Sequence, residues 1–424
     1  MTRTSQRTVA TAMVPLVTAC TARAQALSAL ADVRKVTQPG DALRVEQMEA
    51  SPESRRLTRQ AYDLAYDLRL QESLDLLSRA RAVDPTDPAP ARAVAGVTWM
   101  QILCTQGVAT FAAFEGTATA DIVARPAVPE SLRARFIAEI DQAIALAERA
   151  RSLRRDDVEA QYELGASVGL RALYLGTVEG RTFAAFTEGR RAVSLLEDVR
   201  KRAPQHRESA LLPGIYRYAV STFSLPKRLL AAAAGLPGDR ASGIALLEWA
   251  AGGHAATSTD ASIVLMIVYN REGRYSDALR HLRTMVRRHP SNRLLRLNLA
   301  ATELAAGNGA AAVRTIDEGL ELSPSFDEPS IPGERSLWLY VRGAAGVALS
   351  DASARADLQR ALEAGPREWV RARVHVELAK IELAFGSRAQ ALSELDRAAH
   401  HARRAGDDDA RAAARKLRDA NAYE

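Results

Sequence analysis

Residues 262–290 read SIVLMIVYNREGRYSDALRHLRTMVRRHP, and this stretch decides the fold. Leu265 and Tyr269 stand one helical turn apart, so they share one face of a helix. Gly273 allows a tight turn, and Ala278 is small where a second helix crosses the first. Pro290 cannot donate a hydrogen bond within a helix and therefore ends the second one. The stretch predicts two antiparallel helices joined by a short turn.

The same pattern recurs 34 residues later. At that offset, the residues Leu265, Gly273, Ala278, Leu282 and Pro290 are followed by Leu299, Gly307, Ala312, Ile316 and Pro324. A third unit is stretched by an insertion at residues 325–334, and a fourth runs through Leu378 and Gly386. The spacing resembles that of a tetratricopeptide repeat. We therefore predict an all-α fold, a right-handed α-solenoid of stacked antiparallel helix pairs, with weaker versions of the pattern in the N-terminal half.

The composition agrees with a helical fold and excludes other classes. Of the 424 residues, 47% are hydrophobic and 5% aromatic, and the formal net charge is +6. Wholesale disorder and collagen are excluded, because 47% hydrophobic residues are enough to build a core. A large β-sandwich or barrel is excluded, because aromatic residues and runs of β-branched residues are scarce. The two cysteines, Cys20 and Cys104, cannot form a disulfide framework.

Five segments are expected along the chain. They are a signal or lipoprotein signal peptide at 1–26, a linker at 27–52, a degenerate helical-repeat half at 53–253, tetratricopeptide repeats at 254–406 and a capping helix at 407–424.

The N-terminus carries two alternative processing signals. Arg3 and Arg7 precede an uncharged, mostly apolar stretch. Residues 17–20 then match a bacterial lipobox with Cys20 as the lipidated residue, whereas residues 24–26 match the A-x-A pattern of ordinary secretory cleavage. We expect an exported protein, either periplasmic or anchored to a membrane through a Cys20 lipid. The alternative is a cytoplasmic protein with a weakly apolar tail.

The middle of the chain resembles a known family. Residues 223–230 (FSLPKRLL), 236–240 (LPGDR) and 243–248 (GIALLE) are similar to the middle of the inclusion body clearance family, which includes the tetratricopeptide repeat protein 39 group. The chain departs from that family at residues 231–234, where the family has larger apolar residues. The resemblance implies a helical-repeat scaffold linked to lipid droplets, inclusions or unidentified complexes. The chain also looks distantly like the lipoprotein subunit of some periplasmic solute transporters.

The repeat register predicts a groove for a partner. The first helices of each pair line the inside of a solenoid. The side chains expected there are Ile267, Asn270, Arg271, Leu297, Leu304, Arg373, Val376 and Lys380. This mostly apolar lining suits a protein or peptide partner, either an amphipathic helix or the chain's own N-terminal segment. We therefore expect a non-enzymatic scaffold for protein–protein interaction, with a transporter accessory subunit as the alternative.

Catalytic, metal and nucleic-acid sites are not expected. Residues 165–169 fit the G-x-S-x-G elbow of a serine hydrolase with Ser167 as nucleophile, but they lie within helical apolar spacing. The seven histidines form no zinc motif, so we expect no metal and no cofactor. Arginine clusters lack interleaved aromatic residues, which argues against nucleic acid. Residues 93–114 are uncharged and long enough to span a bilayer, but their polar content favours a helix buried by its neighbours.

Overall fold

The structure is a computed structural model that describes residues 51–108, 126–223, 237–253, 256–322 and 330–421, together with Leu225, Arg228 and Ala232. The predicted leader, Cys20, most of the linker and most of residues 224–236 lie outside the described residues. Residues 51–424 form one compact unit. In the described part there are helices and no strand, which confirms the predicted all-α class.

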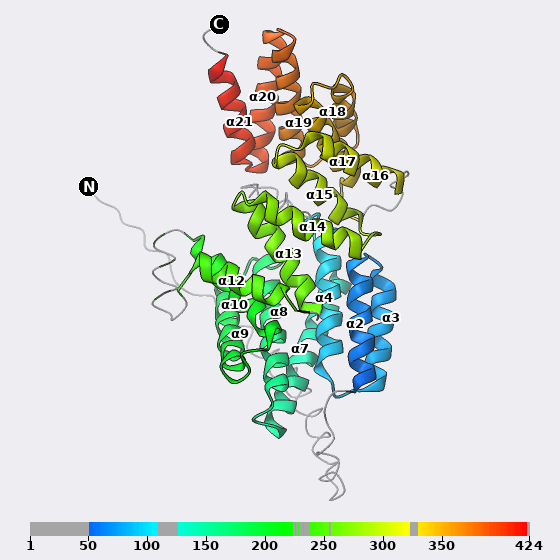
Figure 1. Ribbon diagram of the computed structural model, residues 1–424, viewed down its shortest axis with the longest axis vertical. Helices are drawn as coiled ribbons and strands as arrows, with labels where there is room; N and C mark the ends of the chain where they lie inside the picture. Colours follow the sequence, from blue (N-terminus) through cyan, green and yellow to red (C-terminus); the bar gives the residue numbers. More distant parts are fainter. Residues whose placement is uncertain are drawn as a thin grey trace, which may run out of the picture. The chain divides into compact units, whose positions relative to one another are not determined.

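Seventeen α-helices and one short 3-10 helix make up the described part (Figure 1). They are α2 (Pro52–Tyr66), α3 (Leu70–Val83), α4 (Pro88–Thr105), α7 (Glu130–Leu153), α8 (Val158–Thr177), α9 (Thr182–Arg202), η3 (Arg207–Ala210), α10 (Leu211–Ser221), α12 (Arg240–Ala251), α13 (Ala256–Arg271), α14 (Tyr275–Arg288), α15 (Arg293–Ala305), α16 (Gly309–Leu322), α17 (Glu334–Ala348), α18 (Ala354–Glu363), α19 (Glu368–Ala384), α20 (Arg388–Ala405) and α21 (Asp408–Ala420).

Successive helices pack as pairs, and each pair packs on the next. The stretch quoted first forms α13 and α14, and the next repeat forms α15 and α16. Ala278 and Ala312 are fully buried, as the crossing positions require. The insertion before the third unit falls partly on residues 323–329, outside the described residues, and α17 begins after it. These pairs confirm the predicted α-solenoid of antiparallel helix pairs.

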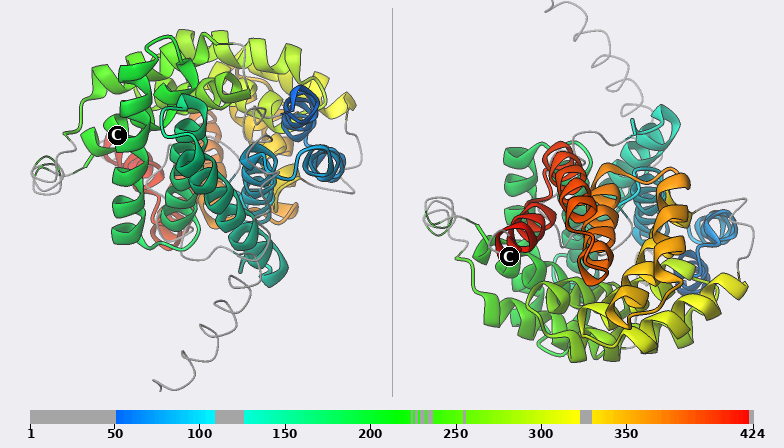
Figure 2. Two further views of the ribbon diagram at one scale, coloured as in Figure 1. Left: turned by 90° about the horizontal axis from the view of Figure 1, so that it is seen from below. Right: turned by 90° about the horizontal axis from the view of Figure 1, so that it is seen from above.

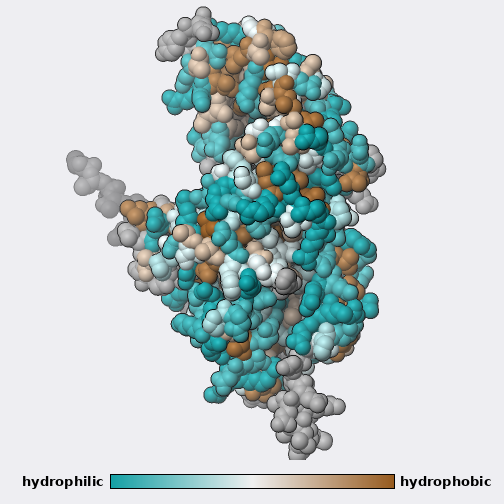
Figure 3. Space-filling model, viewed as in Figure 1, coloured by the Kyte–Doolittle hydropathy of each residue, from teal (hydrophilic) through white to brown (hydrophobic). Residues whose placement is uncertain are grey.

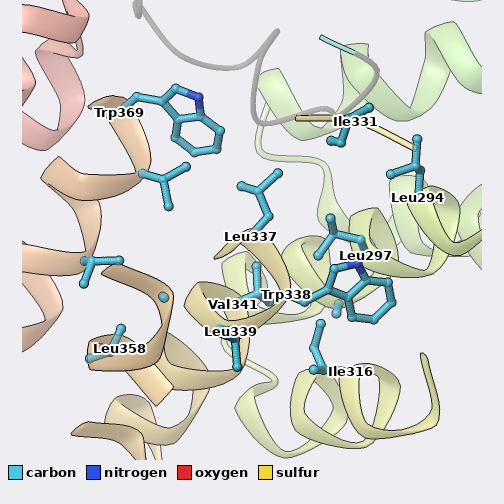
Figure 4. Close-up of a cluster of buried hydrophobic side chains, with 14 of the residues drawn as sticks. Leu294, Leu297, Ile316, Ile331, Leu337, Trp338, Leu339, Val341, Leu358 and Trp369 are labelled. Carbon is cyan, nitrogen blue, oxygen red and sulfur yellow. The ribbon is translucent and has the colours of Figure 1, made fainter. Parts of the chain in front are cut away.

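The largest apolar cluster lies in the C-terminal repeats. It centres on Trp338, which is fully buried, and it joins α15, α16, α17 and α19. Figure 4 shows the Trp338 indole between Leu297 and Ile316. A side chain at Gly319 would collide with this indole, since its Cβ would lie 2.3 Å from the ring.

No described helix is long and apolar enough to cross a membrane. The first part of the apolar stretch 93–114 belongs to α4, and most of its apolar side chains are buried against neighbouring helices. Residues 109–114 lie outside the described residues.

Candidate functional site

Three of the eight predicted groove residues are buried, which corrects the expected lining. Leu297 belongs to the Trp338 cluster, and Val376 packs between α19 and α20. Asn270 is also buried, and its Nδ2 donates to the Met266 carbonyl oxygen at 2.9 Å. These three side chains are only 3–6% exposed, so they serve mainly to pack the fold.

The other five groove residues keep some exposure but are scattered over three helices. Ile267 and Leu304 are half-buried, and Arg271 is exposed. The Arg373 guanidinium is held by Asp407 at 2.9 Å, and Lys380 pairs with Glu377 at 2.7 Å. These five stay a predicted groove, although its two C-terminal cations already have intramolecular partners.

The first described helix, α2, contacts the start of α15 through its last residue, Tyr66. The two views of Figure 2 show α2, in dark blue, beside the yellow-green helices of the first C-terminal repeats. The Asn292 Nδ2, at the beginning of α15, donates to the Tyr66 carbonyl oxygen at 2.6 Å. Tyr66 in turn donates its hydroxyl to Asp260 of α13 at 2.5 Å. These two bonds tie the end of α2 to α13 and to the start of α15.

A buried polar cluster extends from this contact across four helices. Arg92 of α4 makes two bonds of 2.8 Å to the Glu163 carboxylate of α8. Burial raises the pKa of Asp260 to about 6, although Tyr66 and Arg92 oppose the shift. Paired in this way, the charges satisfy one another, as buried charges must. These residues hold helices together. They are far apart in the sequence and belong to no common repeat position, so a periodic pattern could not predict their contacts.

A polar pocket of about 440 Å³ opens on the surface between α12, α13 and α14. Its lining consists of Glu248, Ala251, Gly252, Tyr269, Arg274, Asp277, Arg280 and His281. The Arg274 guanidinium lies 4.3 Å from the Tyr269 ring centroid, and the Tyr269 hydroxyl donates to Glu248 at 2.6 Å. Burial, and then the charge of Arg280, lower the pKa of His281, so this imidazole stays neutral near pH 7.

A second arginine–aromatic stack adjoins the pocket. Arg207, at the start of η3, lies 3.8 Å above the Trp249 ring and donates to the Trp249 carbonyl oxygen at 3.2 Å. Trp249 is 41% exposed, although it lies on a helix whose other face is buried. Figure 3 shows apolar patches over α12 and α13 among hydrophilic surroundings. We call the pocket together with Arg207 and Trp249 the α12–α14 face.

The sequence pattern did not predict this face. Tyr269 was interpreted only as part of the repeat core, and it is indeed 2% exposed. The usable signal was the outward position of Trp249 on a helix whose buried residues are Ile244, Leu246, Leu247 and Ala250. Tryptophan is enriched among the residues that carry binding energy at protein interfaces, so its exposed position beside a pocket is the feature to look for.

Ser167 does not stand at a nucleophile elbow. It lies in the middle of the continuous helix α8 and is fully buried, and its Oγ has no hydrogen-bond partner. The flanking glycines serve packing, because a Cβ at Gly165 would lie 2.8 Å from Leu196 and one at Gly169 would lie 2.0 Å from Leu212. The elbow needs a strand-to-helix turn that exposes the serine, and this site has none.

The thiol and metal chemistry of the described part is limited. No group of three or more histidine, cysteine or acidic side chains lies close enough there to hold a metal ion. Cys104 is a buried free cysteine, and burial together with the Glu334 charge raises the pKa of its thiol to about 12. A thiol held protonated in this way is unreactive while the fold is closed.

Comparisons with known proteins find a family match within the C-terminal half of the chain. Residues 269–328 match the tetratricopeptide repeat family. No curated protein matches the chain significantly. Among solved structures, the chain is similar to a tetratricopeptide repeat protein from Parabacteroides merdae ATCC 43184, at 13% identity and a TM-score of 0.29, over 77% of this chain and 100% of that one.

Two further solved structures are similar over most of the chain. The human IFIT1 dimer with m7Gppp-AAAA has 13% identity and a TM-score of 0.39, over 83% of this chain and 82% of that one. Yeast Tom70 has 12% identity and a TM-score of 0.36, over 89% and 91%. By its own helix pairs the chain is a helical-repeat protein, and its residues 269–328 match the tetratricopeptide repeat family.

Proposed function

We propose that this chain is a non-enzymatic scaffold that binds a protein partner, and that the α12–α14 face is its docking surface. The observation that carries the proposal is the pair of arginine–aromatic stacks beside a pocket, with Trp249 at its edge 41% exposed. Tryptophan, tyrosine and arginine dominate the binding energy of protein interfaces. Because the guanidiniums of Arg207 and Arg274 already rest on rings, these two side chains would lose little further entropy when a partner docks.

The experiment is quantitative affinity purification from the native host with three forms of the chain. They are the wild type, Trp249→Ala, and Phe385→Ala as a matched control. Phe385 is 76% exposed but lies at the end of α19, away from the α12–α14 face. We expect a partner that the wild type and Phe385→Ala retain and that Trp249→Ala loses by at least about tenfold, as truncation of a hot-spot residue does. Equal recovery with all three forms would refute the docking surface.

Export through a lipid on Cys20 is the second part of the proposal. Its support is the lipobox at residues 17–20, which falls at the end of the apolar stretch, whereas Arg23 interrupts the approach to the alternative cleavage site. The intact mass of the chain from its host decides the question. An acylated Cys20 as the new N-terminus supports the anchor, and a start at Leu27 indicates secretion. An intact Met1 in the cytosolic fraction removes export.

We also propose that the chain is related to the inclusion body clearance family. Gly238 and Asp239, in the segment that resembles the inclusion body clearance family, have clear structural roles: a Cβ at Gly238 would lie 2.4 Å from the Ser221 nitrogen, and Asp239 accepts from the Ser242 amide at 3.1 Å to cap α12. The competing proposal is an accessory subunit of a periplasmic solute transporter. Co-purification with a membrane permease would favour that alternative.

A further inference from the structure

A histidine is buried where the end of α2 meets the middle repeats, and its ring makes no hydrogen bond. His289 follows directly after α14 and is 1% exposed, and neither of its ring nitrogens has a hydrogen-bond partner. The centroid of its ring lies 5.5 Å from that of Tyr66, the last residue of α2. Buried polar groups are nearly always hydrogen-bonded, so His289 is an exception at this contact.

A carboxylate at the end of α2 faces this imidazole without bonding to it. The His289 Nδ1 and the Asp67 Oδ1 are 3.7 Å apart, and that oxygen is also buried without a hydrogen bond. A hydrogen bond between nitrogen and oxygen needs about 2.7–3.2 Å, so the two groups attract each other but form none. A positive charge on His289 would therefore lack the bonded partner that a buried charge requires.

The charges around His289 partly cancel, so burial decides its protonation. Asp63 and Asp67 face it from α2 and the residue after it, and Arg288 faces it from α14 and pairs with Asp63 at 2.9 Å. Burial lowers the pKa of His289 below its ordinary value of 6.5, and Arg288 adds to the shift although both carboxylates oppose it. The imidazole is therefore neutral near pH 7.

The elements on the far side of the contact bind Tyr66. At the start of α15, the neutral Asn292 donates to the Tyr66 carbonyl oxygen, and Asp260 of α13 accepts from the Tyr66 hydroxyl. Asp260 titrates in the opposite direction to His289, because its pKa is about 6 in the fold against an ordinary value of 3.8. At pH 5.5 its proton uptake favours the closed contact by about fourfold, so a test of His289 must remove this opposing effect.

We propose that this contact is an acid-sensitive clasp, in which protonation of His289 loosens the hold of the middle repeats on the end of α2. The charged imidazole needs water, and water reaches it once α2 moves away from α14. An imidazole that is protonated less readily in the closed contact than in the open one favours opening as the pH falls. The clasp is therefore fully closed above about pH 6.5 and weakens below it. It depends neither on the α12–α14 face nor on export.

The experiment measures amide hydrogen exchange of α2 in the full chain carrying Asp260→Asn, at pH 7.5 and at pH 5.5. Dividing by the intrinsic exchange rates leaves the protection factor, which reports local opening. We expect protection in α2 to fall between about threefold and tenfold on acidification, the upper value being the limit for a histidine with an open-state pKa of 6.5. Adding His289→Gln should abolish the fall. The matched control is His400→Gln, since His400 is exposed on α20, and that variant should keep the full response.

A second measurement needs no substitution at the clasp. Exchange of the imidazole Cε1 hydrogen in the wild type follows the titration of each histidine, and the midpoint for His289 should lie lower in the folded chain than in urea. This reading decides the matter if His289→Gln fails to fold. Three results would overturn the clasp: unchanged or increased α2 protection at pH 5.5 in Asp260→Asn, an equal fall after His289→Gln, or a folded midpoint at or above the unfolded one.

Discussion

A single methyl group at Gly243 tests how closely α10 and α12 cross. Gly243 lies in the first half of α12, and a Cβ there would stand 2.7 Å from the Tyr218 amide nitrogen and 3.0 Å from the Gly214 carbonyl oxygen, both in α10. These are backbone atoms, so no side chain can swing aside to make room. Gly243→Ala must push the two helices apart.

Two effects of opposite sign act in this variant. Alanine is favoured over glycine inside a helix by about 1 kcal/mol. Overpacking of a tight contact costs roughly 1–3 kcal/mol, and the backbone position of the clash places this cost near the upper end. We expect a net loss of about 1–2 kcal/mol, which corresponds to a factor of about 5–30 in local opening.

Amide hydrogen exchange measures this loss helix by helix. Protection in α10 and α12 should fall by that factor in Gly243→Ala. The control is Gly96→Ala in the middle of α4, where a Cβ would meet only the Leu170 side chain at 3.9 Å. In Gly96→Ala, the amides of α4 should exchange more slowly, because alanine has a higher helix propensity than glycine. Increased protection in both variants would refute the close crossing.

Three further predictions follow from buried positions. Ala278→Leu should overpack the α13–α14 crossing and cost roughly 1–3 kcal/mol in thermal or urea unfolding; an unchanged midpoint would mean that the repeat register is wrong. Asp260 has a folded pKa of about 6 against an ordinary value of 3.8, so its protonation stabilises the fold below about pH 4, and this contribution is lost as the pH rises through 6. Unfolding curves should show this pH dependence in the wild type and not in Asp260→Asn. Ser167→Ala removes a buried hydroxyl without a partner, so stability should hold or rise by up to about 1 kcal/mol, and a generic esterase assay should give the same reading for both forms.

The repeats could be predicted from sequence because their signals are local. Gly273 and Ala278 report a turn and a helix crossing within one pair, and both stand where the spacing places them. Three of the eight expected groove residues are buried instead of accessible. Periodicity predicts which way a side chain points, but it does not show whether another helix packs against it. Leu297 faces inward as its register requires, and there it enters the Trp338 cluster, against which the turn after α2 also packs.

The α12–α14 face escaped prediction for a related reason. Its residues serve the fold and the surface together: Tyr269 is buried in the repeat, yet its ring carries Arg274 and its hydroxyl holds Glu248. The spacing that identifies Tyr269 as a repeat position says nothing of the arginine above it. Arg207 and Trp249 are 42 residues apart, outside any repeat unit, so no pattern joins them.

The contact of α2 with the later repeats changes how this solenoid should behave. In an open stack, each unit depends on its neighbours alone, and unfolding can begin at either end. Here α2, a helix at one end of the described stack, is tied through Tyr66 and Leu68 to α13, α15 and the Trp338 cluster. The first helix pair therefore cannot fray freely, and the middle repeats lose contacts when it leaves. The bond between Asn292 and Tyr66 thus ties together segments of the chain that are 226 residues apart, so loss of the first helix pair removes contacts from the middle of the stack as well as from its end.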